Sequence, residues 1–353
     1  MNIKSALVIL ISLIWGFVNN ASAQQETLVI ADFIKNNPEK SAMYLVQNGK
    51  VLADIHSDRK SPLASTVKII VAIEYATQAA AGKISPAAMI DTVELGKYYM
   101  PNTDGGAHPL WLATMQKQGL VNEGKVSLEE VAKGMINFSS NANTEYLLDL
   151  LGLENINAQL DKLGLKEHEK LYYFVSALAV INGKALSELE KMSLSEYIIE
   201  TNKAHEQFKN DKNYKSTIKN IPLDAQKVWS DRLVRSTPKE YVSIMQKING
   251  RKFFGEKVQR NIDIVMEGIL ANPVNRQWLA HAGMKGGSTL WVLTKSCYAT
   301  TTTGETTEFA YFFNNLTIAE SIQLRKNMDS FELAILNNRD GKRDEILEIL
   351  KGK

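Results

Sequence analysis

The strand-forming segments of this sequence lie near its two ends, and this arrangement constrains the fold more than any other feature. Residues 41–58 contain two apolar runs on either side of Asn48-Gly49, a dipeptide that favours a tight hairpin turn. Residues 283–294 and 308–314 are two further apolar runs with a glycine-containing turn between them, which predicts a second hairpin. The sequence between the hairpins is mainly helical in character. Joining both ends in one antiparallel sheet backed by helices predicts an α+β fold.

An all-helical lobe is expected between the sheet-forming ends, over about residues 83–280. Within it, the Gly, Pro and Asn content of residues 93–111 predicts an irregular loop. Ser127 and Glu130 have the spacing of a capping box and predict the start of a helix. Residues 155–230 combine helical sequence with Lys and Glu clusters, which predicts a solvated part of the lobe.

The composition is that of an ordinary globular protein. The 353 residues are 44% hydrophobic and 23% charged, which allows a large core in one large or two modest domains. With 41 basic and 39 acidic residues the net charge is +2, so the sequence gives no reason to expect a nucleic-acid partner or an anionic membrane surface. The five histidines are scattered without the spacing of metal ligands, so neither a metal nor another cofactor is expected.

The N-terminus has the pattern of a secretory signal peptide. Lys4 precedes an apolar stretch at residues 6–18, and Ala21-Ser22-Ala23 follows as a small-x-small cleavage site. We expect a signal peptide over residues 1–23 and a mature domain over residues 24–353 that is periplasmic or secreted. The apolar stretch is short for a membrane span, so no stable anchor is expected after cleavage. The oligomeric state is not predicted.

The only cysteine, Cys297, can form no internal disulfide. It lies in a strand-like run, where a free cysteine is more often buried filler than a catalytic group. The core alone is therefore expected to stabilise the exported chain.

The candidate nucleophile is Ser65, which begins the apolar helical run that continues through residues 67–76. A serine at a helix start lies near unpaired backbone N–H groups and the positive end of the helix dipole. Lys68 follows three residues later on the same helix face. Burial in apolar surroundings lowers the pKa of a lysine, so this amine can accept the serine proton.

The Ser-x-x-Lys spacing alone is not specific, because it occurs by chance in most chains of this size. Only Ser65 follows a strand hairpin and begins a strongly apolar helix, and this context selects it. The same spacing occurs three more times, at Ser57/Lys60, Ser216/Lys219 and Ser236/Lys239.

Two further elements follow in the chain. Ser139 and Asn141 lie two residues apart between helical segments, where a hydroxyl and an amide can face a cleft. Taken alone, both residue types are more often helix caps. Lys285 begins a Lys-Gly-Gly sequence at residues 285–287, just before a strand-like run.

These three elements, in this order, resemble the S-x-x-K, S-D-N and K-T-G signature of serine β-lactamases and penicillin-binding proteins. The class A β-lactamase type is the most similar. The resemblance also includes the hairpin before Ser65, a Tyr-x-Pro sequence at residues 99–101 and the helix start at residues 236–238, and it covers most of the mature chain.

The resemblance implies a role for each matching residue. Ser65 would attack the substrate carbonyl, and its backbone N–H with that of Ser288 would form the oxyanion hole. Lys68 would accept the proton, and the Ser139 hydroxyl would pass one to the leaving atom.

The remaining matches would bind substrate. Asn141 would hold Lys68 and a substrate amide, and Lys285 would supply positive charge for a substrate carboxylate. Tyr99 at the rim and Gly287 and Ser288 on the strand complete the expected substrate site.

Three departures separate this chain from the class A pattern. The central Asp of S-D-N is Ser140, and the hydroxyl residue of K-T-G is Gly286, so a carboxylate donor is missing unless Ser288 replaces it. The E-x-x-L-N motif, whose glutamate activates the deacylating water, is absent, and a longer segment at residues 164–235 takes its place. Glu167 and Glu169 lie near the expected position but have the sequence context of solvated residues.

The sequence therefore predicts a serine hydrolase that forms an acyl-enzyme on Ser65, with hydrolysis of the β-lactam amide as the leading activity. An esterase or D-alanyl-D-alanine peptidase on the same fold is one alternative. A second is a sensor that binds β-lactams or cell-wall peptides without turnover. His108, in a Gly-rich stretch between the first two motifs, is either an acid/base group at the rim or a histidine that stabilises a turn.

Overall fold

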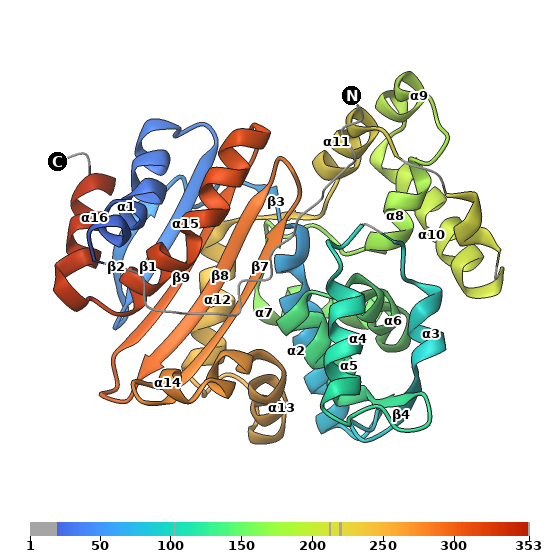
Figure 1. The fold of residues 1–353 in the computed structure, drawn as a ribbon, viewed down its shortest axis with the longest axis horizontal. Coiled ribbons are helices and arrows are strands. Elements are labelled where there is room, and N and C mark those ends of the chain that lie inside the picture. Colours follow the sequence, from blue (N-terminus) through green and yellow to red (C-terminus); the bar gives the residue numbers. More distant parts are fainter. Residues whose placement is uncertain (1–19, 102, 212, 219–220, 352–353) are drawn as a thin grey trace.

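The computed structural model describes residues 20–101, 103–211, 213–218 and 221–351. Its centre is a five-stranded antiparallel sheet with strand order β2-β1-β9-β8-β7 (Figure 1). The strands are β1 (Ser41–Gln47), β2 (Lys50–Ile55), β7 (Leu279–Ser288), β8 (Leu293–Thr301) and β9 (Thr306–Phe313). Strands from both ends of the chain build this sheet, which confirms the expected α+β fold.

The two ends of the chain meet where β1 pairs with β9, from Ser41 opposite Phe313 to Gln47 opposite Thr307. The first hairpin turns at Asn48 and Gly49, whose φ angles of 47° and 75° are those of a tight two-residue turn. The second strand region differs from the expectation, because residues 289–292 form a turn rather than the middle of one strand. The Thr289 hydroxyl accepts the backbone N–H groups of residues 291 and 292, both at 3.2 Å, and so stabilises the turn.

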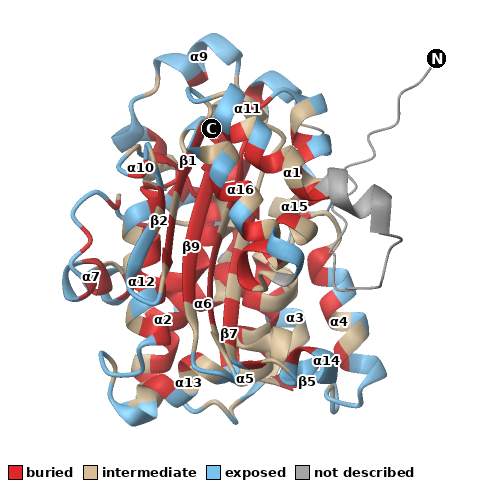
Figure 2. Ribbon diagram, turned by 90° about the vertical axis from the view of Figure 1, so that its left-hand side faces the viewer, coloured by how far each residue is buried: buried red, intermediate tan, exposed pale blue. Residues whose placement is uncertain are grey.

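Helices cover both faces of the sheet. Helices α1 (Asn20–Asn36), α15 (Ile318–Leu336) and α16 (Lys342–Leu350) pack on one face, and α12 (Pro238–Asn249) packs on the other. Alternate residues of β9 therefore belong to different cores. Phe309, Tyr311 and Phe313 join the core under α15, while Ala310 and Phe312 join the core that continues into the helical lobe. Strands β1 and β9 are buried along most of their length, whereas the edge strand β2 is largely exposed or half-buried (Figure 2).

Helix α2 (Lys68–Ala80) is the centre of the helical lobe. It is buried along most of its length and packs against helices α6, α7 and α13. The other elements are β3 (Ser61–Pro62), β4 (Met89–Asp91), α3 (Thr92–Lys97), α4 (Ala107–Lys117), β5 (Lys125–Ser127), α5 (Leu128–Lys133), α6 (Asn141–Leu151), α7 (Leu153–Leu163), α8 (Phe174–Val180), α9 (Leu186–Lys191), α10 (Leu194–Asn210), the turn η3 (Tyr214–Thr217), α11 (Leu223–Asp231), β6 (Arg235–Ser236), α13 (Glu256–Met266), the turn η4 (Gly268–Ala271), α14 (Pro273–Arg276) and the turn η5 (Arg339–Gly341).

The expectation of an irregular loop over residues 93–111 was wrong at both ends, because α3 and the first half of α4 lie there. The Asp91 carboxylate caps α3 by accepting the N–H of Val93 at 2.8 Å. The Asp104 carboxylate accepts the N–H groups of Gly106 and His108 at 3.1 and 3.0 Å. The glycines thus form the turn into a helix, and His108 lies buried in its first turn.

The expectation of a solvated segment after α7 was also wrong in part. The segment is helical, but α8 is buried along its whole length. Its apolar side chains join the core of the lobe. The Lys and Glu clusters that suggested exposure lie on α9 and α10 instead.

The expected apolar stretch of the signal peptide falls at residues 6–18, outside the described residues. The expected cleavage site, residues 21–23, lies in the first turns of α1. Within the described part of the chain, no helix combines the length and apolarity needed to cross a membrane.

Candidate active site

Ser65 and Lys68 lie at the start of α2, next to the edge strand β7. Ser65 is in a single 3-10 turn, η1 (Ala64–Val67), and Lys68 is the first residue of the α-helix. The pairing of β3 with β6 and the hydrogen bond from the Leu63 N–H to the Val234 carbonyl, 2.9 Å, fix the chain before this turn. Ser65 is partly exposed, and Lys68 is almost fully buried.

The Lys68 amine reaches the second motif. Its Nζ donates to the Ser139 carbonyl oxygen at 2.8 Å, to Asn141 Oδ1 at 2.8 Å and to Ser139 Oγ at 3.3 Å. Lys285 Nζ approaches the same hydroxyl from β7, at 3.0 Å from Ser139 Oγ. Ser139 therefore lies between two lysines, and the structure brings Lys68, Ser139, Asn141 and Lys285 together.

Burial controls the ionisation of both lysines. Loss of solvation lowers the pKa of Lys68 to about 7, against the opposing attraction of Asp104 and Glu145. The pKa of Lys285 is also well below its usual value, because of burial and of repulsion by Lys68 and Lys295. Among the described residues neither Lys68 nor Lys285 has an ion-pair partner. At neutral pH the site therefore holds an amine, that of Lys68, which can accept a proton, and burial disfavours the charged form of Lys285 beside it.

Gly287 allows β7 to approach η1 closely. A Cβ at this position would lie 2.4 Å from the Leu63 carbonyl oxygen, 2.5 Å from the Ser65 nitrogen and 2.7 Å from Thr294 Oγ1. Gly286 faces the other side of the strand, and a Cβ there would meet nothing closer than 3.5 Å. Packing around Ser65 thus requires glycine at position 287 but not at position 286.

The Ser288 side chain points toward α15. Its Oγ accepts from Arg325 Nη1 at 2.9 Å, and Arg325 Nη2 donates to the Thr289 carbonyl at 2.6 Å. Burial lowers the pKa of Arg325. Sequence reasoning missed this arginine, because nothing local marks a residue that reaches the strand from a helix 37 positions away.

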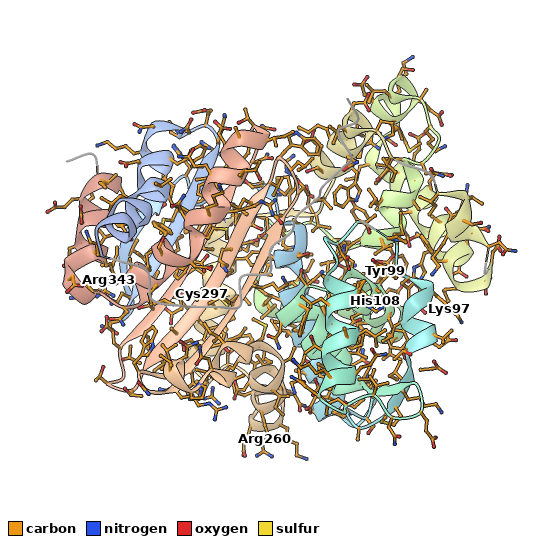
Figure 3. The ribbon with its side chains drawn as sticks, viewed as in Figure 1. Lys97, Tyr99, His108, Arg260, Cys297 and Arg343 are labelled. Carbon is orange, nitrogen blue, oxygen red and sulfur yellow. The ribbon has the colours of Figure 1, made fainter. Side chains whose placement is uncertain are left out.

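Tyr99 lies in the segment between α3 and α4. Its ring is partly buried and stands 5.1 Å from the His108 imidazole, centre to centre (Figure 3). His108 itself is buried behind the Ser139 turn, so it is not an exposed acid/base group at a rim. Cys297 is buried in β8, as expected for filler.

A buried carboxylate, Glu145, lies one helical turn after Asn141 on α6. Its oxygens accept the N–H groups of Phe174, Val175 and Ser176 at 2.9, 3.1 and 3.0 Å, and also the Ser176 hydroxyl. These are the first residues of α8, so Glu145 on α6 binds the N-terminus of α8 and connects residues 164–235 to the rest of the helical lobe. Its i, i+4 spacing from Asn141 was a signal for this position that sequence reasoning did not use.

The two glutamates weighed from the sequence make other contacts. Glu167 pairs with Lys60 at 3.2 Å, and Glu169 Oε2 accepts the Arg235 backbone N–H at 2.9 Å. These contacts connect the segment after α7 to the residue before β3 and to β6. Among the described residues, no group of three His, Cys, Asp or Glu side chains is arranged to hold a metal ion.

This sheet-and-helix fold, with Ser65-x-x-Lys68 at the start of the central buried helix, places the chain among the penicillin-recognising serine enzymes. The chain belongs to the beta-lactamase enzyme family, whose family model matches residues 27–310. Family and fold support a function of the serine β-lactamase and penicillin-binding type.

Solved structures with the same fold have low sequence identity. A β-lactamase from Sphaerobacter thermophilus is 17% identical, with 87% of this chain and 96% of that chain covered and a TM-score of 0.55. A β-lactamase from Chitinophaga pinensis is 15% identical, with 89% and 99% covered and a TM-score of 0.53. A variant of the protein PBP-A, described as an acyl-enzyme complex with penicillin G, is 16% identical, with 89% and 96% covered and a TM-score of 0.50. No curated protein sequence gave a significant match.

Proposed function

We propose that this protein is an exported serine hydrolase that forms an acyl-enzyme on Ser65, with β-lactams as the leading substrate class. The observation that carries the proposal is the Ser139 hydroxyl, which lies 3.3 Å from Lys68 Nζ and 3.0 Å from Lys285 Nζ, while Ser65, in the turn that leads into Lys68, is partly exposed. The acylated PBP-A variant is a precedent for this fold.

Acylation follows from the ionisation of the site. Because burial brings the pKa of Lys68 to about 7, a substantial fraction of the amine is neutral at physiological pH and accepts the Ser65 proton. Ser65 Oγ attacks the carbonyl carbon, and the backbone N–H groups of Ser65 and Ser288 stabilise the oxyanion. The Ser139 hydroxyl then gives a proton to the leaving nitrogen and recovers one from Lys68.

An anionic substrate suits the site, because its carboxylate would favour the charged form of the buried Lys285. Lys285 is buried without an ion-pair partner among the described residues, and the Ser288 hydroxyl, which accepts from Arg325, keeps its own proton to donate. Together they supply the carboxylate contacts that the residue at position 286 lacks. Asn141 and Tyr99 complete the binding site, Asn141 through the substrate amide and Tyr99 at the rim.

Deacylation is the slow step in this proposal. Glu145, a buried carboxylate of this region, already accepts three backbone N–H groups and one hydroxyl, so it has no free lone pair with which to activate water. Loss of a well-placed general base slows a step by about a hundredfold to ten-thousandfold. This observation favours the second candidate, an esterase or peptidase, in which a smaller acyl group lets water reach Lys68 as the base.

The test is intact-mass spectrometry over time after mixing with benzylpenicillin or with an activated ester. We expect a penicillin adduct that accumulates and persists, faster turnover of the ester, and neither reaction in Ser65→Ala. Fast β-lactam turnover without a trapped adduct would mean that a base in residues 164–235 activates water. If neither substrate gave an adduct or a product, the result would support a binding protein without turnover.

Export remains part of the proposal and rests on the sequence alone. Lys4, the apolar stretch at residues 6–18 and the small residues at 21–23 support a cleaved signal peptide and a periplasmic or secreted product. A lysine-based serine site needs no metal or other cofactor.

A further inference from the structure

Ser139 is held in a backbone conformation that a serine seldom adopts. Its φ and ψ are 64° and 25°, in the left-handed region, directly after the single π-helical turn η2 (Gly134–Phe138). This conformation lets both the carbonyl and the hydroxyl of Ser139 meet Lys68. Such a conformation persists only where the surroundings enforce it.

A buried polar network lies behind this turn. His108 Nδ1 is 3.0 Å from Ser140 Oγ and 3.2 Å from Asn143 Oδ1. Ser140 Oγ caps α6 by accepting the Asn143 N–H at 3.2 Å, and Asn143 Nδ2 donates to the Val131 carbonyl at 3.0 Å. His108, Ser140 and Asn143 are all buried. The network therefore links α4, α5 and α6 immediately behind Ser139.

The network assigns the proton on the imidazole. Because Asn143 Nδ2 donates to Val131, the amide oxygen faces His108 and Ser140, and the Ser140 hydroxyl donates to it at 3.0 Å, so His108 Nδ1 can pair with Ser140 Oγ only as a donor. Burial lowers the pKa of His108, against the attraction of Asp104 and the hydrogen bond to Asn143, so the ring is neutral near pH 7. A neutral ring with its proton on Nδ1 satisfies both neighbours.

The surroundings of His108 are closely packed. A Cβ on Gly134 would lie 2.4 Å from both Asn143 Nδ2 and Trp111 Nε1. The Trp111 and Tyr99 rings flank His108, with ring centres at 5.5 and 5.1 Å. The His108 backbone N–H is fixed at 3.0 Å from Asp104 Oδ2. This contact fixes the backbone from which the imidazole extends.

We propose that His108 is a positioning residue for Ser139: its Nδ1–H donor holds the Ser140–Asn143 pair, and that pair holds the left-handed turn that presents Ser139 to Lys68. Ser140 stands where the S-D-N motif has aspartate, and His108 supplies the second partner that the shorter side chain needs. The inference rests on the proposed function, because the affected step is acylation of Ser65.

The test uses the different reach of two amide side chains. Asparagine can place a donor near the Nδ1 position, whereas glutamine reaches toward Nε2, so His108→Asn should preserve acylation and His108→Gln should not. For His108→Gln we expect the limiting rate constant of benzylpenicillin adduct formation to fall roughly tenfold to a hundredfold, as for about 1 Å of misplacement, with the half-saturating concentration little changed. His168→Gln is the matched control, because this second buried histidine binds Tyr241, at 3.1 Å, away from the turn.

Hydrogen exchange gives a readout that does not depend on turnover. Backbone amides of residues 139–144 should exchange faster in His108→Gln than in wild type, and His108→Asn should restore protection. Equal acylation and equal exchange in His108→Gln and wild type would overturn the positioning role. Failure of wild type to form any adduct would overturn the proposed function instead, and the exchange data would then decide the positioning role alone.

Discussion

Replacing Gly287 by alanine tests how closely β7 must approach the nucleophile. The new Cβ would lie 2.4 Å from the Leu63 carbonyl oxygen and 2.5 Å from the Ser65 nitrogen, whereas ordinary contacts begin at 3.4 Å. The strand and the 3-10 turn must therefore separate by about 1 Å, and both sides of that contact are backbone. Displacement of this size at a reacting group costs about a hundredfold in rate. Overpacking of the site should also cost about 1–3 kcal/mol of stability.

Gly286→Ala is the matched control, because its Cβ would meet nothing closer than 3.5 Å. We expect its acylation rate to stay within about twofold of wild type, since such substitutions typically change free energies by less than ~0.5 kcal/mol. The assay is the rate of benzylpenicillin adduct formation by intact mass, with denaturant unfolding of each variant. Wild-type acylation by Gly287→Ala, or equal loss in both variants, would refute the close-approach argument.

Three further predictions concern ionisation, stability and processing. The acylation rate should fall about tenfold per pH unit below about pH 7, where the Lys68 amine becomes protonated, and an acid limb with its midpoint near pH 10 would contradict the burial argument. His205 is buried, which opposes its charged form, but hydrogen bonds to Asp149 and Glu145 outweigh burial and raise its pKa. Its stabilising contribution is therefore full below about pH 6.5 and is lost as pH rises through the folded-state pKa, so the unfolding free energy of His205→Gln should differ from wild type more at pH 5.5 than at pH 8.5. Exported protein should begin at Gln24 on N-terminal sequencing, and a product retaining the initial methionine would exclude cleavage.

Local sequence signals predicted the elements whose structure depends on neighbouring residues. Asn48-Gly49 predicted the first hairpin because its turn needs two residues with positive φ. Thr237 before Pro238 marked the start of α12, where the Thr237 hydroxyl accepts the Glu240 N–H at 3.2 Å. The same reasoning failed at Gly105-Gly106, where glycine density indicated a loop but the Asp104 carboxylate, directly before the glycines, accepts the His108 N–H in the first turn of α4.

The prediction that residues 155–230 are exposed to solvent failed for a different reason. The charged residues of this segment suggested exposure, yet α8 is buried because Glu145 satisfies the unpaired N–H groups at its start. A carboxylate on one helix that completes the N-terminus of another has no local sequence signature.

The sequence by itself determined the chemical groups of the site and their order along the chain: a serine and a lysine one turn apart on an apolar helix, then a hydroxyl with an amide, then a lysine before two glycines. Only the tertiary structure decided their properties. Lys68 and Lys285 are 71 and 146 residues from Ser139, and the fold alone brings both amines within 3.3 Å of its hydroxyl. The pKa of Lys68 is about 7 because side chains from many elements exclude water from it, and the sequence near a residue does not determine its solvation. The same fold engages both oxygens of Glu145 in hydrogen bonds and turns the Ser288 hydroxyl toward Arg325. The type of a residue therefore limits the chemistry that it can perform, and its surroundings in the fold decide which of these reactions is open to it.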